Sequence, residues 1–93
     1  MLHKVIINVS GRVQGVGFRY FTLETARRIE GITGFVKNLP NGSVEIEAEG
    51  TKEKLEKFIE EIKKGPPLSR IKDITLNWLT IEKRQKNDFT IEI

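Results

Sequence analysis

The chain contains no cysteine and only one histidine, His3. Without cysteine there is no disulfide, no thiolate nucleophile and no cysteine-based metal site, which favours a cytoplasmic location. A single histidine cannot build a Ser-His-Asp triad or a two-histidine metal site. We expect His3 to lie at the surface, ahead of the first strand.

Long apolar runs are also missing, so the sequence predicts neither a membrane-spanning helix nor a signal peptide. The 16 basic and 13 acidic side chains leave a formal charge of only +3. This excess favours a small anionic ligand but is modest for a dedicated nucleic-acid-binding protein. With 93 residues and no break in composition, we expect a single domain over residues 1–93 that binds neither membrane nor nucleic acid.

Alternating and helical spacings of apolar residues follow one another along the chain. They predict strands over residues 4–10, 32–38, 44–48, 74–78 and 89–93, and helices over residues 18–29 and 52–63. Asn41-Gly42 is a hairpin-turn signal, which is a sufficient structural reason for Asn41. The order predicts an α+β, ferredoxin-like two-layer sandwich, β-α-β-β-α-β with a short extra C-terminal strand, in which two helices cover one face of an antiparallel sheet.

The segment GRVQGVGFR, residues 11–19, lies between a predicted strand end and a predicted helix start. Gly11, Gly15 and Gly17 can adopt positive φ and turn backbone N–H groups inward, as a phosphate-sized nest requires. Arg19 falls in the first helical turn, where the helix dipole also favours an anion. On this pattern alone, an ordinary connecting turn with a solvated Arg19 remains the simpler interpretation.

Three segments, GRVQGVGFRYF, GFVKNLPNGSVEIEAEG and KGPPLSRI, closely resemble the acylphosphatase family, and together the resemblance covers nearly the whole chain. It implies a ferredoxin-like fold, a loop that cradles the phosphoryl group, and catalysis by an arginine and an asparagine. These correspond to Arg19, which closes the glycine motif, and Asn38, which closes GFVKN. The segment ARRIEGITGFV is one residue longer than is usual in the family. The implied phosphate-binding residues are Arg12, Val13, Gln14, Gly15, Val16, Gly17 and Phe18.

The chemistry of these residue types agrees with the resemblance. The loop holds no nucleophile, so water must attack the phosphorus directly, and that requires an activated substrate. An acyl phosphate qualifies because its leaving group is a carboxylate, whose acid has a pKa of about 4, and needs no general acid. Loop amides and Arg19 would stabilise the charge on the phosphoryl oxygens, Asn38 would orient the water, and the proton would pass to the substrate phosphate. We expect no metal and no cofactor, with inorganic phosphate as product and competitor.

Other candidate residues favour structural interpretations. Glu45, Glu47 and Glu49 share one strand face, but carboxylates about 7 Å apart are too far from one another to hold one cation without further ligands, so a solvated face is expected. Residues 83–86, KRQK, are interpreted as a basic surface loop. Trp78 is expected to pack on a strand face. Tyr20 lies off the apolar stripe of its helix, and we assign it no catalytic role.

Three alternatives to a free-standing enzyme remain. An RNA-recognition domain shares the same element order, but it needs stacking aromatics on its first and third strands, where this chain has none. A second alternative is a domain of a larger hydrogenase-maturation enzyme that handles acyl or carbamoyl phosphate. The third is a phosphate-binding module without turnover. We expect a monomeric acylphosphatase acting on a small-molecule acyl phosphate.

Overall fold

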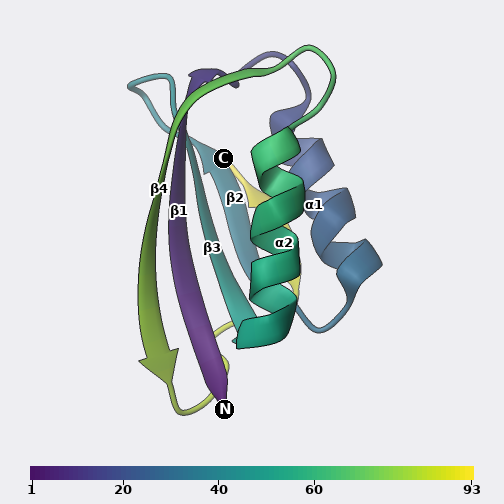
Figure 1. The fold of residues 1–93 in the computed structure, drawn as a ribbon, viewed down its shortest axis with the longest axis vertical. Coiled ribbons are helices and arrows are strands. Elements are labelled where there is room, and N and C mark those ends of the chain that lie inside the picture. The colour runs from purple at the N-terminus through teal and green to yellow at the C-terminus, as the bar shows by residue number, and fades with distance from the viewer.

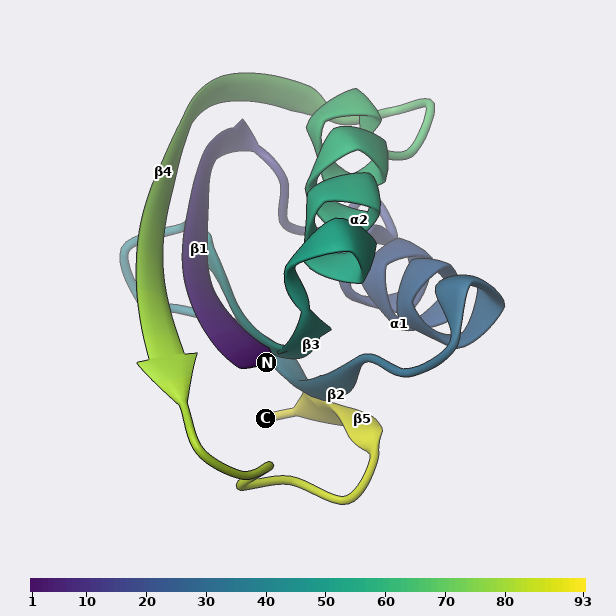
Figure 2. The same ribbon diagram turned by 60° about the horizontal axis from the view of Figure 1, so that its bottom comes forward.

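A computed structural model describes residues 1–93 and has the predicted element order (Figure 1). The elements are β1 (Leu2–Arg12), α1 (Phe18–Ile29), β2 (Thr33–Asn38), β3 (Val44–Thr51), α2 (Lys52–Lys64), β4 (Arg70–Ile81) and β5 (Phe89–Glu92). The five strands form one sheet in the order β4-β1-β3-β2-β5, and both helices cover the same face of it (Figure 2). The predicted ferredoxin-like two-layer sandwich is therefore confirmed.

The closing strand β5 makes the sheet mixed rather than purely antiparallel. It pairs in parallel with β2, from Phe89 beside Gly34 to Glu92 beside Lys37, whereas the other strand pairs are antiparallel. The loop 82–88 crosses from β4 to the end of the sheet where β2 begins (Figure 2). Both strands therefore start at the same end and run in the same direction.

Strands β1 and β4 are longer than predicted. They pair along their whole length, from Leu2 opposite Ile81 to Arg12 opposite Arg70. Strand β4 is an edge of the sheet, and polar side chains at its start are exposed to solvent. The backbone pairing of β4 therefore extends beyond both ends of the apolar alternation at residues 74–78.

His3 lies within β1, so its predicted position ahead of the first strand is wrong. Period-two alternation places it on the same face as Val5. Its half-buried ring meets Trp78 edge-on, with 6.2 Å between the ring centres. Trp78 packs against the core, as predicted for a strand-face residue.

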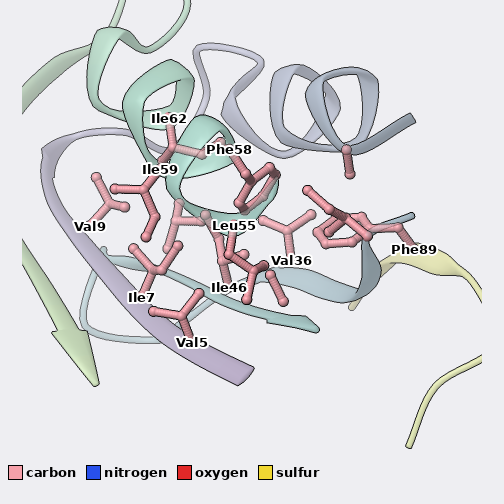
Figure 3. Packing of buried hydrophobic residues seen from close by; sticks show 14 of the residues in the cluster. Val5, Ile7, Val9, Val36, Ile46, Leu55, Phe58, Ile59, Ile62 and Phe89 are labelled. Carbon is pink, nitrogen blue, oxygen red and sulfur yellow. The ribbon is translucent and has the colours of Figure 1, made fainter. Parts of the chain in front are cut away.

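The core fills the space between the sheet and the two helices (Figure 3). The alternating residues of β1 and the helical stripe of α2 meet there, as their spacing predicts. Prominent members are Val5, Ile7, Val9, Val36, Ile46, Leu55, Phe58, Ile59, Ile62 and Phe89. The rings of Phe58 and Phe89 lie edge-on with 5.9 Å between their centres, so the closing strand is tied directly to α2.

The turn after α1 has an unusual backbone conformation. Helix α1 ends at Ile29, as predicted. Glu30 then adopts a φ of 64°, in the left-handed region that non-glycine residues rarely enter. Its N–H donates to the carbonyl of Ala26 at 3.2 Å, which closes the helix before β2 begins.

Glu49 on the helix-free face of the sheet is fully buried, so the prediction that it is solvated is wrong. Its carboxylate accepts hydrogen bonds from Thr33 Oγ1 at 2.9 Å, from the Gln85 N–H at 2.9 Å and from the Lys86 N–H at 3.1 Å. The backbone of the loop 82–88 folds over this face and needs an acceptor there. Glu49 is thus the anchor of that loop.

The basic segment 83–86 is likewise part of this anchor and not only a surface patch. Arg84 donates to Thr33 Oγ1 at 2.9 Å, to the Glu49 carbonyl at 3.2 Å and to the Gly31 carbonyl at 2.8 Å. Three carbonyl or hydroxyl acceptors from the β2 and β3 region therefore hold one guanidinium. The basic composition of residues 83–86 predicted only a surface loop, because the sequence does not show which backbone acceptors face Arg84.

Glu49→Ala is expected to lower the free energy of unfolding by about 3 kcal/mol, because three partly buried hydrogen bonds to a fully buried carboxylate are lost. Urea unfolding followed by circular dichroism measures this. Glu45→Ala is the matched control: Glu45 is partly exposed and lies 3.8 Å from Lys37, and its loss should change stability by less than about 1 kcal/mol. Equal losses in the two variants would contradict the anchor role.

Candidate functional site

The segment 13–17 joins β1 to α1 and is shaped by two glycines. Gly15 has a φ of 73° and Gly17 a φ of 83°, a region open to glycine at no steric cost. A Cβ atom added to either residue would meet no heavy atom within 4 Å. The backbone conformation, and not close packing, requires glycine here, and the space beside the loop is open.

Gly11 has a different role from the one expected. It belongs to β1, with a φ of 121°, and an added Cβ would lie 2.3 Å from the carbonyl oxygen of Arg70. Glycine at this position allows β1 and β4 to pair across an irregularity between Ser10 and Gly11. The part of the glycine motif that faces the site is therefore the segment 13–17.

The N-terminus of α1 lies directly after this loop and is left uncapped. Gly17 is the N-cap residue and offers no side-chain acceptor, and the first turn contains no acidic residue. The first helical bond runs from the Phe21 N–H to the Gly17 carbonyl at 3.0 Å. The N–H groups of the preceding turn therefore lack helical partners, and the positive end of the helix dipole is uncompensated.

Arg19 and Asn38 line one pocket of about 250 Å³ beside this helix end. The pocket lining consists of Val13, Gly15, Gly17, Phe18, Arg19, Tyr20, Asn38 and Ile91. Every hydrogen bond and ion pair made by an arginine side chain belongs to Arg28 or Arg84, so the Arg19 guanidinium is free. No carboxylate lines the pocket, and its single formal charge is positive.

Asn38, the last residue of β2, carries the second polar group of the pocket. Its Oδ1 atom is buried, and no donor in the chain lies within hydrogen-bond distance. An unpaired buried acceptor typically costs about 1–3 kcal/mol. Asn38 therefore brings to the pocket an amide whose oxygen has no partner within the chain.

Gln14 fixes the loop relative to Asn38. Its Nε2 atom donates to the carbonyl of Leu39 at 2.8 Å and to the carbonyl of Ser43 at 2.9 Å. These two residues flank the hairpin turn that follows Asn38. Within the turn, Asn41 Oδ1 accepts from the Ser43 N–H at 3.0 Å, in agreement with the structural role predicted for Asn41.

The structure brings together six of the nine residues implied by the resemblance: Val13, Gly15, Gly17, Phe18, Arg19 and Asn38. Three others do not line the pocket. Arg12 is exposed at the end of β1, the Gln14 side chain is engaged with the hairpin, and Val16 packs against the core.

Tyr20 and Ile91 line the pocket without having been predicted to do so. Tyr20 directly follows Arg19 in the first turn of α1, so its helical position was a usable signal. The position of Ile91 depends on the parallel pairing of β5 with β2, which the sequence does not reveal.

No group of three or more His, Asp or Glu side chains is arranged to hold a metal ion. No helix has the length and apolar character needed to cross a membrane, and the longer of the two has 13 residues.

Comparison with known proteins gives the same family for the sequence in two independent ways. The acylphosphatase family model matches residues 5–91. The acylphosphatase of Archaeoglobus fulgidus is 51% identical over 76 residues, covering 82% of this chain and 84% of the relative. That of Syntrophotalea carbinolica is 46% identical over 79 residues, 85% of each chain.

Solved structures extend the similarity to the whole fold. The crystal structure of acylphosphatase from Bacillus subtilis has a TM-score of 0.88 and 42% identity, with both chains fully covered. Full-length HypF, crystallised in a phosphate- and nucleotide-bound form, has a TM-score of 0.85 and 34% identity over 99% of this chain but only 12% of HypF. From its sequence, its fold and its pocket, the chain belongs to the acylphosphatase family.

Proposed function

We propose that this protein hydrolyses the carboxyl–phosphate bond of small-molecule acyl phosphates, giving a carboxylate and inorganic phosphate. One observation carries the proposal. The free guanidinium of Arg19 and the unpartnered Oδ1 atom of Asn38 share one pocket at the uncapped N-terminus of α1. A group that can bind an anion and an amide that can orient water thus line the same pocket.

The phosphoryl group would be held by the loop and by Arg19. Backbone N–H groups at a helix N-terminus favour an anion, and the planar guanidinium can donate to two phosphoryl oxygens at once. Charge spreads over these oxygens in the transition state of phosphoryl transfer. Donors fixed in place before the reaction stabilise that charge without reorganising.

Water would be the nucleophile. The pocket lining contains no serine, threonine, cysteine, histidine or carboxylate, so a covalent phosphoenzyme through one of these groups is not available. Asn38 Oδ1 would accept one proton of the water in a hydrogen bond, and its Nδ2 would donate to a phosphoryl oxygen. A neutral amide is too weak a base to remove that proton, which would pass to the substrate phosphate.

The leaving group determines which phosphate compounds can react. A carboxylate leaves as a stable anion and needs no proton at neutral pH, because the pKa of a simple carboxylic acid is about 4. A phosphate monoester leaves an alkoxide and needs a general acid, and no carboxylic acid or histidine lines this pocket. The site therefore favours acyl phosphates over monoesters.

The proposal needs only one copy of the chain, because all the lining residues come from one chain. A monomer is accordingly the proposed active form. The lack of cysteine is the basis for proposing that the reaction takes place in the cytoplasm.

The test is hydrolysis of benzoyl phosphate in the presence of EDTA, with phenyl phosphate as the monoester control. We expect turnover of benzoyl phosphate that EDTA does not change, competitive inhibition by inorganic phosphate, and no turnover of phenyl phosphate. Phosphate binding without turnover would instead support a binding module. Loss of turnover in EDTA would refute the metal-independent mechanism.

Gly15→Val is expected to weaken inorganic phosphate binding about tenfold, because a β-branched residue at a φ of 73° is strained by about 1–3 kcal/mol and shifts the loop. Inhibition by phosphate measures the effect. Gly42→Val is the matched control: Gly42 has a φ of 93° and equally open surroundings, but lies in the hairpin turn outside the pocket. If both variants bind phosphate as the unmodified protein does, the loop does not form the anion site.

A further inference from the structure

Two pocket residues, Tyr20 and Ile91, have no part in holding the phosphoryl group. The other six lining residues form the glycine loop, the start of α1 and the end of β2. Tyr20 is 63% exposed and Ile91 36% exposed, so the pocket lining includes two uncharged side chains that solvent can reach. Neither side chain carries a charge.

Strand pairing places Ile91 close to Asn38. Ile91 lies beside Val36 in the parallel pair of β5 and β2, and Val36 is two residues before Asn38 on the same strand. Residues two apart on a strand point to the same face of a sheet. Ile91 and Asn38 therefore project from neighbouring strands toward the same side, where α1 begins.

Tyr20 lines the same pocket from the N-terminal end of α1. It sits in the first turn of α1, next to Arg19. The aromatic pairs of the chain involve other residues, and Tyr20 takes part in no side-chain hydrogen bond. The Tyr20 side chain is therefore largely exposed and engaged by no other aromatic ring or side-chain hydrogen bond.

The pocket is larger than a phosphoryl group needs. The three terminal oxygens of a phosphoryl group, at roughly 30 Å³ each as for liquid water, take up about 90 Å³, well under the 250 Å³ of the pocket. The space that remains belongs to a pocket whose lining includes Tyr20 and Ile91. A substrate whose phosphoryl group rests on the loop must place its acyl group in this space, because the loop and Arg19 surround the other end.

We infer that Tyr20 and Ile91 form the acyl-binding subsite and that it selects aromatic or other bulky apolar acyl groups over the acetyl group. The inference rests on the proposed acyl phosphate hydrolysis and adds the class of acyl group. A ring can stack on Tyr20 and contact Ile91 with its edge, and aromatic pairs of this kind are favourable beyond simple burial. An acetyl group is too short to make both contacts.

The experiment compares kcat/KM for benzoyl phosphate and for acetyl phosphate, each expressed relative to the unmodified enzyme so that the intrinsic reactivities of the two substrates cancel. Tyr20→Ala should lower the value for benzoyl phosphate by about three- to tenfold and leave that for acetyl phosphate within about twofold. Ile91→Ala should lower the benzoyl value in the same selective way. Tyr20→Phe should retain the benzoyl value, since the ring and not the hydroxyl makes the contact.

Leu79→Ala is the matched control, because Leu79 is 42% exposed on β4, at the other edge of the sheet. It should leave both substrates and phosphate inhibition unchanged. Equal losses for the two substrates in Tyr20→Ala, or no loss for either, would overturn the acyl subsite while leaving hydrolysis established. An unmodified enzyme that hydrolyses neither compound would overturn both the subsite and the proposed function.

Discussion

Arg19→Ala is expected to lower kcat for benzoyl phosphate by a factor of on the order of 100 to 1,000, as removal of one fixed donor from an oxyanion site does in other enzymes. Arg19 is the only charged residue lining the pocket, and it forms no ion pair that could compensate its loss. Steady-state kinetics at saturating substrate measure the effect. Inorganic phosphate should also inhibit this variant more weakly, because the same guanidinium binds the product.

Arg27→Ala is the control for this change. Arg27 lies in the last turn of the same helix, is exposed and forms no ion pair. Its removal alters the net charge by the same amount, but at the far end of α1. Retained activity in Arg19→Ala, or an equal loss in Arg27→Ala, would refute the assigned role.

Asn38→Ala is expected to lower kcat by a factor of on the order of 100 while leaving the inhibition constant for phosphate within about twofold. The reason is that the amide mainly orients the water, and its one hydrogen bond to a phosphoryl oxygen adds little to the binding supplied by the loop and Arg19. A loss of phosphate binding as large as the loss of turnover would contradict the water-orienting role.

The Asn38→Ala variant also distinguishes a catalytic role of Asn38 from a structural one. Asn38 Oδ1 has no donor in the chain, so Asn38→Ala breaks no internal hydrogen bond through this atom and should leave Tm unchanged or slightly raised. Asn77→Ala, at an exposed position of β4, is the control and should change neither kcat nor Tm. A large drop in Tm for Asn38→Ala would indicate a structural role instead.

The spacing of apolar residues correctly predicted the strands and helices that have one buried face and one exposed face. Val5, Ile7 and Val9 alternate because one face of β1 is fully buried, and the stripe of α2 packs against them. The bounds of α1 were predicted correctly because Gly17 and Gly31 flank a continuous helical pattern. In each case the signal in the sequence and the force that stabilises the element are the same apolar burial.

The full length of the edge strand β4 and the path of the loop 82–88 could not be predicted from the spacing of apolar residues. The start of β4 is held by backbone pairing with β1, which leaves no apolar signature. Glu49 is a charged residue in an alternating strand, and its burial depends on backbone N–H groups of Gln85 and Lys86 far along the chain. Such partners are set by the tertiary fold alone.

The residues of the candidate site likewise fall into those that the sequence could predict and those that it could not. Residues of the glycine loop and Arg19 are contiguous, and Asn38 ends a recognisable motif, so the resemblance could assign them to the proposed phosphoryl site. Ile91 reaches the pocket only because β5 pairs in parallel with β2. The acyl subsite therefore carries little trace in the local sequence, although the phosphoryl site carries a strong one.

The late position of β5 in the chain links the pocket to the order of folding. Val13 and Ile91 line the same pocket from opposite ends of the sequence, and contacts of such long range are the slowest to form, because large loops must close first. A complete pocket is thus present in the native state and not in partly folded states. An anion bound there stabilises the native state by mass action, by about 2.7 kcal/mol at one hundred times its Kd. Inorganic phosphate, the product of the reaction, would then protect the enzyme that releases it against unfolding.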